Sequence, residues 1–154
     1  MVAPQFNLVR LVQRLQLPNR DERRELCVRS GKLAVVREVL LRNGNTALVF
    51  AHSVLARRDL HGAWRGLSRL GSRPLAEMLF HDPTVSRLPM EYKQIDRRHP
   101  LFQRAACVTN MIDTNKIDNA LWARRSVFVK QGRPLLVTEV FLSLPSADKN
   151  SVKS

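Results

Sequence analysis

Residues 121–142 read LWARRSVFVKQGRPLLVTEVFL, and this stretch decides the fold. Two runs rich in β-branched and aromatic residues lie on either side of the turn-forming sequence at 131–133. Pro134 stands at the start of the second run, where a strand tolerates proline. The pattern therefore predicts a β-hairpin with strands at 121–130 and 134–142.

A second stretch of the same kind, VVREVLLRNGNTALVFAHSVL, occupies residues 35–55. Its apolar runs predict strands at 33–41 and 46–55. The dipeptide Asn43-Gly44 between them accepts the positive φ angles of a type I′ turn. Two hairpins of similar length pair most simply in one antiparallel sheet.

The rest of the chain contains short elements without strict strand–helix alternation. We expect strands at 6–12 and 90–95. We also expect three helices: a capped one over 20–26, with Ser30-Gly31 as its stop signal, one over 60–70 that Gly71 stops, and one over 74–80. The fold class is then α+β, a single antiparallel β-sheet of hairpins with a few short helices packed against it. We predict one domain over residues 1–145, a mobile loop at 113–119 and a flexible polar tail at 146–154.

Two opposite charges interrupt the apolar faces of the predicted hairpins. Arg37 shares a strand face with Val35, Val39 and Leu41, and Glu139 shares one with Leu135, Val137 and Phe141. Because a buried ionised group needs a partner, three interpretations remain open. The two residues form a structural ion pair, or their strand faces are exposed, or they line an anion-binding pocket that contains a carboxylate. Arg124-Arg125 would lie beside Glu139, where they either neutralise it or join the pocket.

The composition narrows the function classes. The 26 Lys and Arg residues against 13 Asp and Glu residues give a net charge of +13, which suits nucleic acid, an anionic membrane surface or an anionic small molecule. The basic residues are scattered in pairs without a zinc-finger or basic-zipper pattern, so we disfavour nucleic acid. No apolar stretch is long enough for a membrane span or a secretory signal.

The sequence gives little support for a metal site, covalent catalysis or nucleotide binding. The four histidines are scattered without ligand spacing, which disfavours a metal site, and no G-x-S-x-G motif or glycine-rich phosphate loop occurs. Cys27 and Cys107 lack C-x-x-C spacing and fit free thiols in a reducing compartment, so we expect a cytoplasmic protein.

Both hairpin sequences, together with LSRLGSRPLAEMLF at residues 67–80, resemble the chorismate lyase family in order and spacing. The resemblance covers about residues 9–145. It implies a lyase that converts chorismate into 4-hydroxybenzoate and pyruvate, the first step of ubiquinone biosynthesis, without metal or cofactor. It also implies that the substrate-binding residues are Arg37, Leu75 and Glu139, and we expect a monomer whose partner is chorismate itself.

The implied roles agree with the charge pattern. A guanidinium can clamp a chorismate carboxylate through two hydrogen bonds, which assigns Arg37 to that role. Apolar neighbours favour the neutral form of a carboxyl group, so Glu139 is the expected proton donor to the leaving ether oxygen, and Leu75 is an apolar wall over the ring.

Family members usually carry an additional N-terminal helical segment with a Ser-Met-Thr motif whose methionine contributes to the site, and we expect this sequence to start just after it. Either the natural start lies upstream, or the protein has lost part of its pocket. Without the methionine of that motif, an alternative function is a non-catalytic effector-binding module, because the same fold resembles the ligand-binding domains of a family of bacterial transcription regulators.

Overall fold

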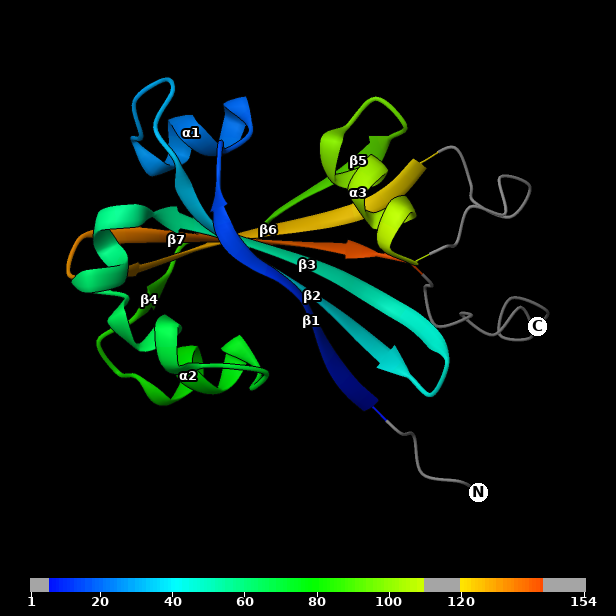
Figure 1. Ribbon diagram of the computed structural model, residues 1–154, viewed down its shortest axis with the longest axis horizontal. Helices are drawn as coiled ribbons and strands as arrows, with labels where there is room; N and C mark the ends of the chain where they lie inside the picture. The colour runs from blue at the N-terminus through cyan, green and yellow to red at the C-terminus, as the bar shows by residue number, and fades with distance from the viewer. Residues whose placement is uncertain (1–5, 110–119, 143–154) are drawn as a thin grey trace.

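The two predicted hairpins form the centre of a seven-stranded antiparallel sheet. The computed structural model describes residues 6–109 and 120–142 (Figure 1). The first hairpin consists of β2 (Ala34–Asn43) and β3 (Thr46–Ala56), and the second of β6 (Ala120–Lys130) and β7 (Arg133–Phe141). Because β3 pairs with β7, both hairpins belong to one sheet, in the order β2-β3-β7-β6. The predicted fold class is confirmed.

The turns of the two hairpins differ. In the first, Asn43 pairs with Thr46, so the loop residues are Gly44 and Asn45, and of these Gly44 alone has a positive φ. The prediction of a type I′ turn centred on Asn43-Gly44 is therefore wrong, because that turn needs two consecutive positive φ angles. The second hairpin has them, at Gln131 and Gly132 (51° and 72°).

Three further pairings complete the sheet. Strand β1 (Phe6–Gln16) pairs with β2 and confirms the strand predicted at 6–12, with four further residues. Strand β5 (Glu91–Asp96) confirms the strand predicted at 90–95, and it pairs with β6. Strand β4 (Ser86–Arg87), which was not predicted, also pairs with β6.

One face of the sheet is covered by two 3₁₀ turns, η1 (Arg57–His61) and η2 (Arg65–Arg69), and by helix α2 (Leu75–His81). The predicted α-helix at 60–70 is wrong. Trp64, Leu67 and Leu70 recur every three residues, which matches the three residues per turn of a 3₁₀ helix, and all three are buried against the sheet. The short helix predicted after Pro74 is confirmed.

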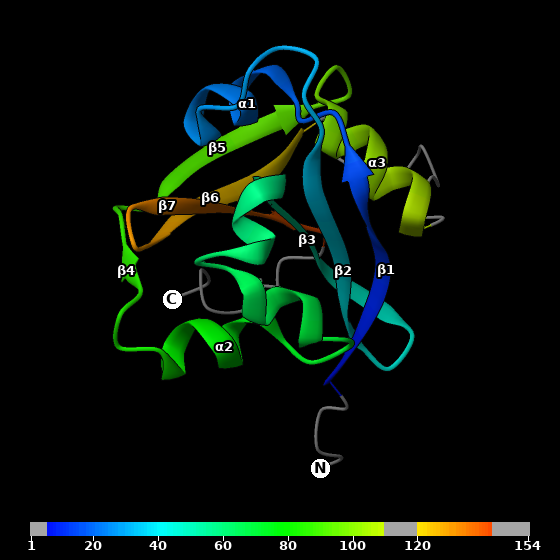
Figure 2. The same ribbon diagram turned by 60° about the vertical axis from the view of Figure 1, so that its left-hand side comes forward.

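The opposite face carries α1 (Arg20–Leu26) and α3 (Pro100–Thr109), which lie across the sheet from α2 in both views (Figures 1 and 2). Helix α1 starts with the expected cap, a capping box between Asn19 and Glu22, and ends at Cys27 and not at 30–31. Helix α3 was not predicted, although Pro100 suits a first helical position and Leu101, Phe102 and Ala105 face the core.

The mobile loop predicted at 113–119 and the tail at 146–154 lie outside the described residues. In the parts of the chain that the structure covers, no helix is long and apolar enough to cross a membrane.

Candidate functional site

A cavity of about 630 Å³ lies between the sheet and α2. The three residues singled out from the sequence, Arg37, Leu75 and Glu139, all line it, although they come from β2, α2 and β7. This result favours the pocket interpretation of the charged residues over exposed strand faces.

Arg37 is the most deeply buried charge in the cavity, with 1% of its surface exposed. Its Nη2 donates hydrogen bonds to the carbonyl oxygens of Arg73 (2.9 Å) and Gly71 (3.3 Å), in the loop before α2. Its Nε is buried without a partner, and burial together with the nearby charge of Arg10 lowers the pKa of Arg37. The loop carbonyls therefore fix one nitrogen of the guanidinium, and no described carboxylate neutralises its charge.

Glu139 does not pair with Arg37, so the structural ion pair considered for these two residues is wrong. Strand β3 lies between them, and the pairings Arg37↔Ser53 and Ala51↔Glu139 place their Cα atoms about 12 Å apart, given ordinary strand spacing and rise. That separation leaves room for a ring-sized ligand.

Arg124 is the partner of Glu139. The two residues lie directly opposite each other on β6 and β7, and the Arg124 Nε and Nη2 donate to the carboxylate at 2.7–3.1 Å. Glu139 is 24% exposed and so is less desolvated than its apolar neighbours suggested. Arg125 contributes to the other face, where it pairs with Asp21.

Between these charges the cavity wall is apolar. Leu75 is the first residue of α2, directly after Pro74, and is buried. It shares the wall with Leu79, Phe128 and Val137. A cavity with an apolar middle and guanidinium groups at its margins fits an anion that carries a hydrocarbon ring. Residues 6–109 and 120–142 contain no cluster of His, Cys, Asp and Glu suited to a metal ion.

A sequence model of the family described as chorismate lyase matches residues 1–152. The chain belongs to the chorismate lyase family. A probable chorismate pyruvate-lyase from Nitrosomonas europaea is 44% identical over 137 residues, which cover 89% of this chain and 74% of that protein. One from Nitrosomonas eutropha is 48% identical over 122 residues, 79% of this chain and 66% of that protein. One from Thiobacillus denitrificans is 45% identical over 137 residues, 89% of this chain and 71% of that protein.

Solved structures with this fold include ligand-binding domains of transcription regulators. The C-terminal domain of PhnF superposes with a TM-score of 0.62 at 17% identity, covering 90% of this chain and 82% of that domain. The C-terminal domain of the histidine utilization repressor from Pseudomonas syringae gives 0.59 at 10% identity, covering 89% and 91%. At these identities the likeness shows only that the chorismate lyase family shares its fold with these domains.

The sequence analysis missed one charged residue of the cavity, Arg87 of β4. Its side chain lies over the Phe128 ring, 5.3 Å from the centroid, and its Nη2 donates to Ser126 Oγ at 2.9 Å. Strand β4 has two residues and lies between Pro83 and Pro89, so no periodic pattern indicated Arg87. The arginine is nevertheless part of the pocket of this chorismate lyase family member.

A second group of charges, which the sequence analysis also missed, lies on the opposite face of the same strands. His52 of β3 lies opposite Glu38 of β2, with its Nδ1 2.9 Å from Glu38 Oε2 and its Nε2 2.9 Å from Glu22 Oε2 of α1. Arg104 of α3 donates to the other oxygen of Glu38 at 2.7 Å. Glu22, Glu38 and His52 are all at most 2% exposed. The turn predicted at Asn43-Gly44 sets Glu38 opposite Val49, and only the observed register, which shifts between Leu41 and Arg42, sets Glu38 opposite His52.

This charged network holds α1 and α3 on the sheet. Burial opposes a charged imidazole, but the hydrogen bonds and charges of Glu22 and Glu38 outweigh it and raise the pKa of His52 to about 9. Burial likewise opposes the Glu38 carboxylate, yet His52 and Arg104 lower the pKa of Glu38.

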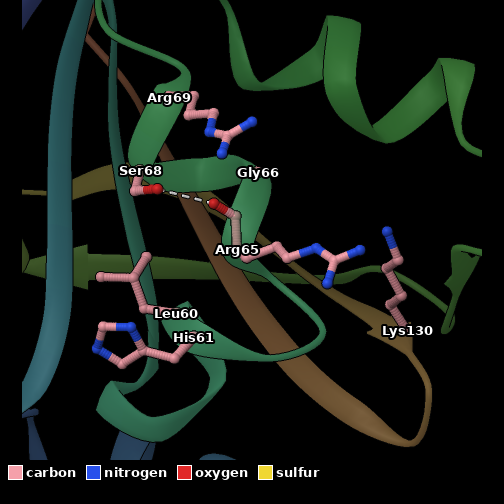
Figure 3. Close-up of a pocket in the computed structure, with 7 residues that line it drawn as sticks. All are labelled: Leu60, His61, Arg65, Gly66, Ser68, Arg69 and Lys130. Atoms are coloured by element: carbon pink, nitrogen blue, oxygen red, sulfur yellow. Dashed lines mark hydrogen bonds between the residues drawn. The ribbon is translucent and has the colours of Figure 1, made fainter.

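A separate hollow of about 410 Å³ opens beside η1 and η2 (Figure 3). Arg65 and Lys130 extend into it from opposite sides, and Arg69 and His61 lie around it. It has no apolar wall comparable to that of the cavity, and its arginines are exposed. An exposed arginine of this hollow can therefore serve as a control for the arginines of the cavity.

Proposed function

We propose that this protein is a chorismate lyase, which converts chorismate into 4-hydroxybenzoate and pyruvate at the start of ubiquinone biosynthesis. The observation that carries the proposal is the buried guanidinium of Arg37, which lines an apolar cavity and has no carboxylate partner among the described residues. Membership of the chorismate lyase family and relatives named as probable chorismate pyruvate-lyases give the substrate class.

Arg37 is proposed to bind the carboxylate on the substrate ring. A charge-assisted hydrogen bond from a buried guanidinium to a carboxylate is strong because both groups leave water, and each compensates the other. The hydrogen bonds to the Gly71 and Arg73 carbonyls keep the guanidinium in place before the ligand arrives. Leu75 and Phe128 would then pack against the ring from either side of the cavity.

The reaction breaks the bond between the ring and the ether oxygen and removes a hydrogen from the neighbouring ring carbon, which makes the ring aromatic. The ether oxygen leaves as enolpyruvate, takes a proton and becomes pyruvate. Glu139 is proposed to carry this proton. Arg124 donates to its side-chain oxygens through Nε and Nη2, and in this proposal Glu139 first accepts the ring proton and then donates it to the leaving oxygen. This order adds a proton-accepting step to the donor role inferred from the sequence.

The proposal also covers the oligomeric state and the cellular location of the protein. We propose that the enzyme is a monomer. Cys27 and Cys107 are free and exposed, which supports a cytoplasmic location.

The test is the formation of 4-hydroxybenzoate and pyruvate from chorismate by the purified protein, beside Glu139→Gln and Arg65→Gln. We expect turnover by the wild type and by Arg65→Gln, a control that removes an exposed arginine outside the cavity. Glu139→Gln should lose at least about 100-fold in kcat while 4-hydroxybenzoate still binds. Full activity of Glu139→Gln would end the proton-carrying role.

The second candidate is a ligand-binding module without turnover, since regulator domains share the fold. Binding of 4-hydroxybenzoate without any pyruvate formation would favour it over the lyase.

A further inference from the structure

The cavity contains more positive charge than its own carboxylate balances. Three guanidinium groups line it, those of Arg37, Arg87 and Arg124, and one carboxylate, that of Glu139. Glu139 is held by Arg124 through two nitrogens. Two positive charges, on Arg37 and Arg87, therefore have no carboxylate partner among the described residues.

Arg87 is held in place although its side chain is exposed. Its guanidinium lies over the Phe128 ring at 5.3 Å, and its Nη2 lies 2.9 Å from Ser126 Oγ and 2.7 Å from Met90 Sδ. An exposed arginine with no acidic partner ordinarily samples many rotamers, and these three contacts restrict it. They occupy one nitrogen, so Nε and Nη1 make no hydrogen bond with any described residue.

The position of Arg87 differs from that of Arg37. Arg37 is buried at one end of the cavity, whereas Arg87 is exposed and comes from β4, at the far edge of the sheet from β1 and β2. The apolar wall that includes Phe128 and Val137 lies between the strands that carry them. The two unpaired charges are thus suited to a ligand with two anionic groups on either side of a ring.

We propose that Arg87 is the second carboxylate-binding residue of this pocket and binds the carboxylate of the enolpyruvyl side chain of the substrate. The inference rests on the proposed lyase function, because it assigns the second of the two carboxylates of chorismate. Since 4-hydroxybenzoate has lost that side chain, Arg87 contacts the substrate and not the aromatic product. Arg87 therefore makes the pocket select the dianionic substrate over its monoanionic product.

The test compares two ligands across three arginine variants. Arg87→Gln should raise KM for chorismate by about 10- to 30-fold, the range of a charge-assisted hydrogen bond that is partly exposed to water, and change the Kd of 4-hydroxybenzoate by less than threefold. Arg37→Gln should weaken the binding of both. Arg65→Gln, in the hollow of Figure 3, removes the same charge outside the cavity and should change neither.

Two further variants separate ligand binding from a structural role of Arg87. Ser126→Ala removes the hydrogen bond that holds Arg87 but keeps the guanidinium, so chorismate KM should rise less than threefold. Arg87→Lys keeps the charge without the planar fork and should fall between the wild type and Arg87→Gln.

The outcomes are distinct. Wild-type KM in Arg87→Gln, with normal turnover of the wild type, would overturn the role of Arg87 and leave the lyase intact. Equal weakening of chorismate and 4-hydroxybenzoate in Arg87→Gln would also overturn it, because Arg87 would then support the whole pocket. Absence of turnover and of 4-hydroxybenzoate binding in the wild type would overturn the lyase and the inference together.

Discussion

The two faces of the central strands carry buried charges of opposite character. On the face toward α1 and α3, His52 contacts both Glu22 and Glu38, and Arg104 contacts Glu38 as well. On the face toward α2, Arg37 is equally buried but has no carboxylate partner among the described residues, and it lines a cavity. Arg37 and Glu38 are neighbours in sequence, so the alternation of a strand assigns one charge to each face.

The difference teaches how to distinguish structural from functional charges. A buried charge that neighbouring elements satisfy contributes to folding, and removing one partner leaves the others uncompensated. A buried charge with free donors beside a cavity gains its compensation from a ligand, and the folded protein holds it at some cost to stability. The following predictions test this distinction, from the largest expected effect to the smallest.

Glu38→Ala should have the largest effect. It removes the carboxylate that faces both His52 and Arg104, and leaves a buried imidazolium with Glu22 alone. We expect the free energy of unfolding to fall by about 3–5 kcal/mol, as measured by urea denaturation. A loss below about 1 kcal/mol would show that the network is not structural.

Stability should decrease in alkaline solution because of His52. Its pKa is raised to about 9 in the folded protein, so its stabilising effect is complete below its ordinary value of 6.5 and is lost as the pH rises through 9. The loss is at most about 3 kcal/mol. Urea unfolding at pH 6 and pH 9.5 measures it, with His52→Gln as the matched control that should lack this part of the pH dependence. An equal pH dependence in both proteins would contradict the assignment.

Arg37→Leu should change stability little although Arg37 is fully buried. The variant loses hydrogen bonds to the Gly71 and Arg73 carbonyls, but it also removes the cost of burying a guanidinium whose Nε has no partner. We expect the free energy of unfolding to change by less than about 1 kcal/mol. A loss comparable to that of Glu38→Ala would place Arg37 in the structural class.

Arg65→Gln should have the smallest effect. Arg65 is an exposed arginine of the hollow beside η2 (Figure 3), and no described residue hydrogen-bonds its side chain. Thermal unfolding should differ from the wild type by no more than the equivalent of about 0.5 kcal/mol. A twofold or larger change in chorismate turnover would indicate that the basic surface assists the reaction.

The strand alternation and the turns predicted most of the fold. Both hairpins and the strand β1 follow from period-2 runs, and Arg37 and Glu139 were found because they interrupt such runs. Their common cavity was predicted as one of several interpretations, and the partner of Glu139 was foreseen among Arg124 and Arg125.

The missed features depend on contacts between elements distant in sequence. Glu38 and His52 lie opposite each other because the register of their hairpin shifts between Leu41 and Arg42, which the predicted turn did not include. Glu22 and Arg104 reach them because α1 and α3 pack on the same face. Arg87 lies on a strand of two residues between prolines, too short for any periodic pattern. The 3₁₀ turns were predicted as an α-helix because a spacing of three residues fits both patterns over a short stretch.

The most direct test of the contrast is calorimetric titration of 4-hydroxybenzoate into the wild type, Arg37→Gln and Arg65→Gln. If Arg37 is held unpaired for an anionic ligand, Arg37→Gln should bind about 100-fold more weakly while Arg65→Gln stays within twofold of the wild type. Wild-type affinity in Arg37→Gln would contradict the assignment of this face of the sheet to ligand binding.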